Sequence, residues 1–144
     1  MIMIIAALVA VVGGALLWFD IQARSYSPAQ PVLTSEAKSY VKNLDLMDVQ
    51  MQAAESYFKQ AVIEIEGKIA NNGDRQLSAI LISCVFYDVY GQVVLRERVP
   101  IVRSKNGGLG PGERRDFRLA FDSLPQSWNQ QMPQLVIAQI DFGT

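Results

Sequence analysis

Histidine is absent from the sequence, and cysteine occurs only once, at Cys84. Without histidine the chain lacks the commonest general base and metal ligand, and no Ser-His-Asp or Cys-His arrangement can form. A single cysteine excludes an internal disulfide and a Cys-x-x-Cys zinc or redox pair. An excess of one charge is missing too, because 13 Lys/Arg oppose 14 Asp/Glu, so there is no basic footprint for nucleic acid. We expect no catalytic residues, no cofactor, no metal and no nucleic-acid partner.

Charge is missing from residues 1–19, MIMIIAALVAVVGGALLWF. A helix that crosses the roughly 30 Å bilayer core needs about 20 apolar residues, and this run with Ile21 just reaches that length. A secretory signal peptide is the alternative, but no Lys or Arg precedes the run, and LLWFDIQARS at its end is a poor cleavage site. The sequence predicts an uncleaved transmembrane helix over residues 1–21 of a single-pass membrane protein.

Small residues recur along one face of this predicted span, every four positions. In lipid, small side chains let a second helix approach closely, and that packing drives helix association. Alanine and glycine are also common in any transmembrane helix, which is the alternative explanation. The residues predicted to pack against a helix of another membrane protein subunit are Ala6, Ala10, Gly13 and Gly14.

The charges around the span leave its orientation open. Arg24 follows the span, and no basic residue precedes it. Counted literally, the positive-inside rule favours a cytoplasmic domain. A short N-terminal tail followed by a long C-terminal domain is nevertheless the usual arrangement of an exported signal-anchor, and on that ground we expect an extracytoplasmic domain.

Residues 22–43 are predicted to be a linker, because their first part is rich in serine, proline and alanine. Within the linker, TSEAKSYVKN (34–43) is a candidate short helix, which Thr34 or Ser35 would cap. The helix is either a lid on the following domain or an element without a particular role.

From residue 44 onward the pattern is that of β-strands. VIEIEGKIAN (62–71) alternates apolar and charged residues, and SAILISCVFY (78–87) is apolar on both faces, as in a central strand. Glu64 and Glu66 fall on the solvent side of their strand and are not expected to form a catalytic pair. About six or seven such strands predict an all-β fold, an Ig-like antiparallel β-sandwich over residues 44–144.

The stretch YDVYG (87–91) places an aspartate between two tyrosines and raises the question of catalysis. A type I turn favours aspartate at its first position and glycine at its fourth, and the aspartate side chain accepts hydrogen bonds inside the turn. We therefore interpret Asp88 as a turn residue. The residues predicted to form structural turns are Gly73, Asp88, Gly91, Pro111 and Gly112.

Three motifs stand in a fixed order: Gly-x-x-x-Asn-x-Gly at 67–73, aromatic-Tyr-Asp-x-x-Gly at 86–91, and Leu-x-Pro-Gly-Glu at 109–113, before Phe117. Together they resemble the FxLYD-type domains and related membrane-anchored bacterial domains of unknown function, although Phe86 stands where the name-giving pattern has leucine. The resemblance implies a small extracytoplasmic Ig-like domain at the bacterial inner membrane, with no enzymatic residues. Its motif residues are Gly67, Asn71, Gly73, Phe86, Tyr87, Asp88, Gly91, Leu109, Pro111, Gly112, Glu113 and Phe117.

Two further features are candidates for contact with a partner. A basic cluster at residues 96–105 is either a solvated edge or a patch for an acidic partner or anionic lipid headgroups. Trp128, in the polar stretch LPQSWNQQMPQ (124–134), either plugs the end of the sandwich or anchors a partner. The candidate contact residues are Trp128, Arg96, Arg98 and Arg103, with Lys105 in the same basic cluster.

These observations predict a non-catalytic membrane protein. Its role would be that of an accessory or structural subunit of a membrane protein complex, or of an anchored protein-interaction module. The alternative is a domain that binds a small ligand or a lipid headgroup at the membrane surface. An enlarged pocket near Trp128 and Arg103 would favour the alternative, whereas a solid core would count against it.

Overall fold

The computed structural model describes residues 33–55 and 61–143. The span predicted over residues 1–21 lies outside these ranges. In the described part, none of the helices combines the length and the apolar composition that crossing a membrane requires. The helix-packing residues that were predicted on the span, Ala6, Ala10, Gly13 and Gly14, also lie outside the described residues.

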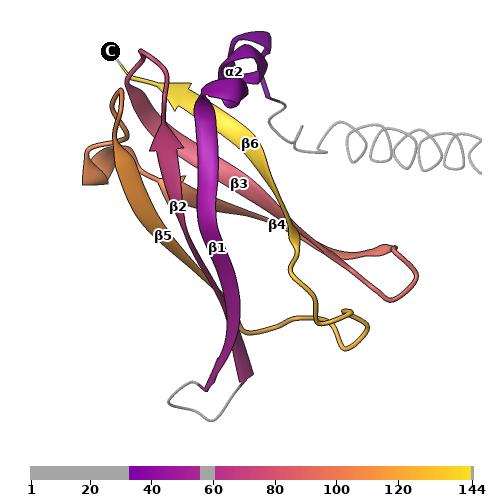
Figure 1. Ribbon diagram of the computed structural model, residues 1–144. Coiled ribbons are helices and arrows are strands. Elements are labelled where there is room, and N and C mark those ends of the chain that lie inside the picture. Colours follow the sequence, from indigo (N-terminus) through magenta and orange to yellow (C-terminus); the bar gives the residue numbers. More distant parts are fainter. Residues whose placement is uncertain (1–32, 56–60, 144) are drawn as a thin grey trace, which may run out of the picture. The chain divides into compact units, whose positions relative to one another are not determined.

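The described chain contains one short α-helix, two 3₁₀ turns and six strands (Figure 1). In chain order they are α2 (Ser35–Tyr40), η1 (Val41–Asn43), β1 (Leu44–Glu55), β2 (Ala61–Asn71), β3 (Leu77–Tyr87), β4 (Val93–Val102), η2 (Ser104–Asn106), β5 (Arg114–Phe121) and β6 (Gln134–Phe142).

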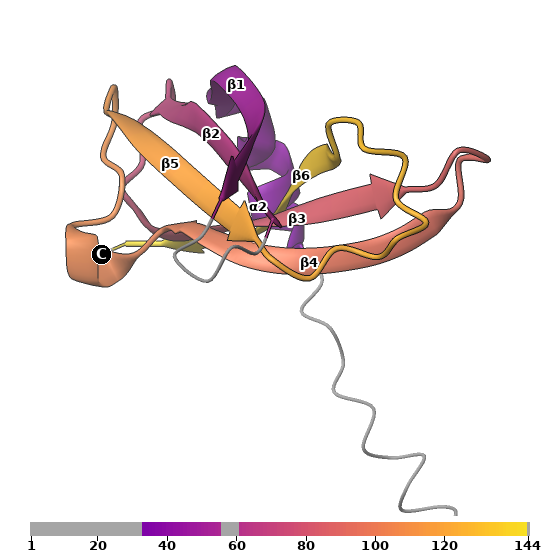
Figure 2. The same cartoon turned by 90° about the horizontal axis from the view of Figure 1, so that it is seen from below.

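The strands form two antiparallel sheets, with the orders β1-β2-β5 and β4-β3-β6. The two sheets face each other around the core, as Figure 2 shows from below, and the arrangement is consistent with a β-sandwich. Because β4 lies against β5 across the core, β6 is left on the side of β1. Two edges of the domain therefore differ: one is closed by β4 and β5, and the other lies between β1 and β6.

Alternation along β2 fixes which face of its sheet points inward. Ile65 and Ile69 are completely buried, whereas Glu64 and Glu66 lie on the opposite face, where Arg118 of β5 pairs with both. The two-residue period of a strand produces this division. The two glutamates are thus held in a surface ion-pair cluster on the outside of the sheet.

The apolar strand β3 is the centre of its sheet. Ile82, Cys84 and Phe86 point into the core and have no exposed surface. Val85, on the opposite face, is only 5% exposed. The double-sided apolar sequence is explained by this position, because β3 has a strand on each side and side chains covering both faces.

The helix α2 belongs to the core although it precedes the first strand. Thr34 caps it, since its Oγ1 accepts a hydrogen bond from the Ala37 N–H at 3.1 Å. Ala37 and Tyr40 are buried against the sheets. The linker predicted over residues 22–43 therefore contains, in its described part, a helix that packs on the end of the two-sheet domain.

Every strand runs between two ends of the domain, which we name by their most distinctive elements. The α2 end consists of α2 and the connections at residues 72–76 and 103–113. The Trp128 end consists of the turn at residues 88–91 and the loop at residues 122–133.

Candidate functional site

A buried asparagine holds the α2 end together. Asn71 has no exposed surface, and its Oδ1 accepts hydrogen bonds from Tyr40 Oη at 2.7 Å and from the Gly73 N–H at 3.1 Å. Its Nδ2 donates to the carbonyl oxygens of Arg75 at 2.8 Å and Leu109 at 3.3 Å. Because a buried polar group is stable only when its hydrogen bonds are made, Asn71 links α2 to both neighbouring connections.

Close packing explains Gly73, the last residue of the Gly-x-x-x-Asn-x-Gly motif. A Cβ at Gly73 would lie 2.2 Å from Tyr40 Oη and 2.5 Å from its Cζ. The Tyr40 ring also meets Phe142 edge-on, with 5.5 Å between centroids, and the Arg75 guanidinium lies 3.7 Å from the Phe142 centroid. The α2 end is therefore closed by close contacts around Tyr40 and Phe142.

The LGPGE motif forms a turn at the same end. The Gly110 carbonyl accepts a hydrogen bond from the Glu113 N–H at 3.1 Å, and Gly112 has a φ of 73°, as the third residue of a type II turn requires. Arg103 and Lys105 are exposed near this turn. Two members of the predicted basic cluster thus lie at the α2 end.

At the Trp128 end, one carboxylate oxygen of Asp88 accepts hydrogen bonds from the backbone. Its Oδ1 accepts hydrogen bonds from the Tyr90 N–H at 2.9 Å and from the Gln92 N–H at 2.8 Å. The Asp88 carbonyl accepts from the Gly91 N–H at 3.2 Å, and Gly91 has a φ of 79°. This geometry explains both residues as parts of a turn.

The neighbouring loop is tied to this turn and carries Trp128 onto the core. The Asn129 N–H donates to the Tyr87 carbonyl at 2.9 Å, and Asn129 Nδ2 donates to the Asp88 carbonyl at 3.4 Å. The Trp128 ring meets Phe86 edge-on, with 5.8 Å between centroids. Within the described part of the chain, the buried Nε1 of Trp128 has no hydrogen-bond partner. Trp128 therefore acts as an apolar plug.

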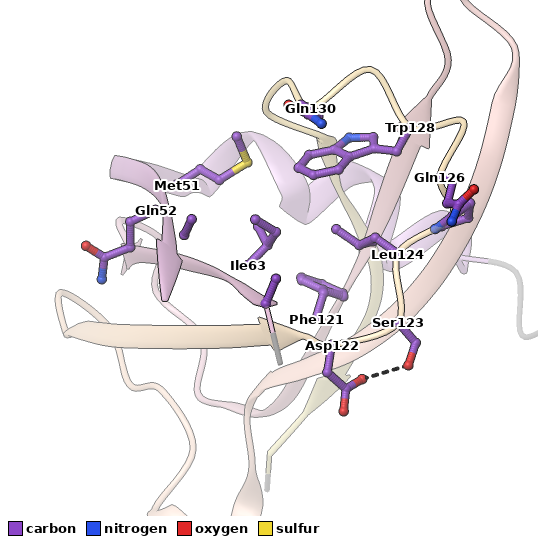
Figure 3. Close-up of a pocket in the computed structure, with 13 residues that line it drawn as sticks. Met51, Gln52, Ile63, Phe121, Asp122, Ser123, Leu124, Gln126, Trp128 and Gln130 are labelled. Atoms are coloured by element: carbon purple, nitrogen blue, oxygen red, sulfur yellow. Dashed lines mark hydrogen bonds between the residues drawn. The ribbon is translucent and has the colours of Figure 1, made fainter. Parts of the chain in front are cut away.

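Beside this plug lies a cavity of about 770 Å³. Figure 3 shows side chains of three strands and of the loop gathered around it. Its floor is the inward face of the β1–β2 pair and of the end of β5, which the loop at residues 122–133 covers in place of the second sheet. The lining residues are Met51, Gln52, Ala53, Ala61, Ile63, Phe121, Asp122, Ser123, Leu124, Pro125, Gln126, Trp128 and Gln130.

The lining is mainly apolar. Apolar side chains form the floor, and Gln126 and Gln130 of the loop stand at the rim, whereas the Gln52 amide donates to Glu64 on the outer face of the sheet. Among the described residues that line the cavity, Asp122 alone is charged, and one carboxylate supplies no acid–base pair. Asp122 accepts a hydrogen bond from the Ser123 hydroxyl at 3.2 Å. The cavity therefore presents an apolar surface edged by loop amides and one carboxylate.

The structure separates the residues that the sequence suggested as one contact surface. Trp128 lines the cavity, whereas Arg103 lies at the opposite end of the domain. Arg96 and Arg98 lie on β4, on the sheet face that points away from the core. The Nη1 of Arg98 is buried and, in the part of the chain described, has no hydrogen-bond partner. The basic cluster and Trp128 do not form a common site.

Sequence reasoning missed the floor of the cavity. Ala53 and Ala61 sit at the ends of β1 and β2 and are exposed. These two small residues at inward positions of the β1–β2 hairpin could have indicated a cavity. That interpretation requires the strand register, which the sequence alone does not give. Cys84 is buried in β3, and burial together with the charge of Glu97 raises the pKa of its thiol to about 12.

Across the described residues, no group of three or more potential protein ligands is placed to hold a metal ion. No protein-family model, curated protein or solved structure matches the chain.

Proposed function

We propose that this chain is a non-catalytic protein-interaction module with an Ig-like fold, held in a membrane by its N-terminal segment as an accessory subunit of a protein complex. The observation that carries the proposal is the apolar cavity beside Trp128. Its walls hold Trp128 among apolar side chains, and tryptophan is enriched among the few residues that carry most of the binding energy of protein interfaces.

The cavity's chemistry indicates what its occupant would be. An apolar side chain of the partner would enter between Ile63, Leu124 and Trp128. The glutamine amides at the rim would then meet the partner's backbone N–H and C=O groups, which need hydrogen bonds once water is excluded. A rim of amides with one carboxylate suits a peptide backbone better than an anionic headgroup.

The other parts of the proposal have separate support. The charge-free run at residues 1–19 supports a membrane anchor. The strand orders β1-β2-β5 and β4-β3-β6 support an Ig-like fold, as does the resemblance to FxLYD-type domains. The described domain begins at the α2 end, so the cavity lies at the end away from the incoming chain.

A small apolar ligand is the second candidate, because a volume of about 770 Å³ falls in the range of small-molecule sites. A lipid headgroup is less well supported, because no cationic side chain is among the described residues that line the cavity. This candidate predicts a bound molecule that copurifies with the domain and leaves when the cavity is filled.

The test begins with the full chain, tagged at its C-terminus and purified from its native membrane in a gentle detergent. Ala53→Trp fills the cavity, whereas Ala120→Trp adds the same bulk at an exposed position on the outer face of β5. We expect a partner in fixed ratio that is lost with Ala53→Trp and kept with Ala120→Trp. Equal retention by both variants, or a monomer without partner or ligand, would overturn the proposal.

A further inference from the structure

The two sheets present four edges, and three of them are guarded against pairing with another chain. β5 carries Arg114, Arg115, Asp116 and Arg118. β4 carries three charged residues at 96–98 and a proline at position 100. β1 carries two aspartates, and its register shifts between Met47 and Gln50, where Asp48 has a φ of 52°. Charges, proline and bulges are the devices by which edge strands avoid adding a further strand.

The fourth edge lacks most of these devices. The nine residues of β6, QLVIAQIDF, contain one charged residue, Asp141, near the end that Tyr40 of α2 covers. A register shift leaves Ala138 without a partner in β3. Before that point Gln134–Ile137 pair with β3 residue by residue, and in the described part of the chain no strand pairs with their other side. We call this free side of Gln134–Ile137 the β6 edge.

Apolar side chains beside the β6 edge are incompletely covered. Leu135 and Ile137 share the inward face with Cys84 and Ile82, their partners in β3. Cys84 and Ile82 have no exposed surface, whereas Leu135 and Ile137 are only partly buried.

On the facing sheet, Leu46, Val49 and Met51 of β1 are partly buried as well. The seam between β6 and β1 is therefore incompletely covered, since among the described residues no strand lies beyond β6.

We propose that the β6 edge is a binding site for an extended strand of a protein partner. The partner strand would hydrogen-bond to the backbone of Gln134–Ile137 and become the fourth strand of the β4-β3-β6 sheet, a mode of recognition that depends on main-chain groups. Its alternate side chains would enter the seam next to Leu135 and Ile137, and must therefore be apolar at every second position.

The outward positions of the partner strand have a different requirement. They would lie beside Val136, which is 45% exposed. Neutral polar residues fit there, and a basic residue fits nearer to Asp141. This site is separate from the cavity beside Trp128, so either proposal can fail while the other holds.

The test uses the full chain in mild detergent and a panel of nine-residue peptides in which valine, isoleucine or phenylalanine alternates with glutamine. A matched panel carries N-methyl groups on alternate backbone nitrogens, which removes hydrogen-bond donors without changing the side chains. Hydrogen–deuterium exchange of residues 134–138 reports protection of the β6 edge. We expect at least one unmethylated peptide to slow exchange there and its methylated counterpart not to do so.

Val136→Lys places a guarding charge on β6, and Val93→Lys is its control. Val93 is also an exposed valine, at 48%, and lies on β4 at the opposite edge of the same sheet. We expect Val136→Lys to weaken peptide binding by about tenfold or more and Val93→Lys to leave it unchanged.

Three results would overturn the proposal: no protection by any peptide, equal protection by methylated peptides, or equal loss in both variants. A concentration-dependent dimer that protects residues 134–138 without peptide would overturn it in favour of pairing between two copies.

Discussion

The two ends of this domain are covered by different kinds of contact. Each must cover the apolar space between two sheets. At the α2 end, a helix and two connections meet on Asn71, and its side chain makes four hydrogen bonds. At the Trp128 end, an indole packs on Phe86, its nitrogen has no partner among the described residues, and a cavity remains beside it.

The difference shows what closes a β-domain completely. Hydrogen bonds fix distance and direction, so the groups around Asn71 can occupy only one arrangement. Apolar contacts are not directional, and the loop that carries Trp128 covers the inward face of β1 and β2 without filling it. A closed end contributes stability, whereas an open end leaves surface for a partner.

Removing the centre of the closed end has the largest expected effect. Asn71→Ala removes four hydrogen bonds at once, leaves the N–H of Gly73 without its side-chain acceptor, and should lower the free energy of unfolding by about 3 kcal/mol. Urea unfolding measures the change. Asn72→Ala is the control, because its exposed amide bonds only to Asp45 and its loss should cost under about 0.5 kcal/mol. Equal costs would contradict the assigned role of Asn71.

Crowding the closed end comes next. Gly73→Ala forces a Cβ against the Tyr40 ring and should cost about 2 kcal/mol. Combining Gly73→Ala with Tyr40→Ala removes the clash, so the double variant should be less destabilised than the sum of the single variants. Additive costs would show that the backbone of the turn, and not the tyrosine, requires glycine.

Deleting one polar tip at each end gives a smaller and more discriminating effect. Tyr40→Phe removes the hydrogen bond of the hydroxyl to Asn71 and its two longer ones with the backbone of Arg75, and should cost about 1.5 kcal/mol. Trp128→Phe keeps an aromatic ring near Phe86 and loses no hydrogen bond, so it should cost under about 1 kcal/mol. Thermal unfolding of the two variants decides the order, and a larger loss for Trp128→Phe would remove the distinction between the ends.

The last effect lies between the ends, is absent at neutral pH and appears only in alkali. Burial raises the pKa of the Cys84 thiol from 9.0 to about 12, so the unfolded chain releases this proton first as the pH rises. The free energy of unfolding should therefore fall between pH 9 and pH 12. Cys84→Ala should lose this contribution to the pH dependence, and identical profiles would show that the thiol is not buried.

The local features of the fold were predictable from the sequence. The alternation in β2, the double-sided apolar pattern of β3, the short helix and the Asp88 turn all depend on neighbouring residues, and the structure contains each of them. Two three-stranded antiparallel sheets agree with the expected sandwich architecture, with six strands in the described residues.

Features that depend on distant residues were not accessible in the same way. The link between Tyr40 and Asn71 spans 31 positions, and nothing in the linker pattern indicates it. The separation of Trp128 from Arg103 follows from strand direction, which sequence spacing alone does not give. The cavity and the β6 edge likewise appear only once the register and the neighbours of each strand are known.

The position of α2 also determines how the domain would bear a mechanical load. A force applied to the chain ahead of Leu33 acts first on α2. The hydrogen bond between Tyr40 and Asn71 transmits part of that force to the end of β2. With a partner held at the Trp128 end, the force runs along the strand axes. The backbone hydrogen bonds between β1 and β2 are then loaded together in shear and do not open one after another. They connect the pairs from Leu44–Asn71 to Glu55–Ala61.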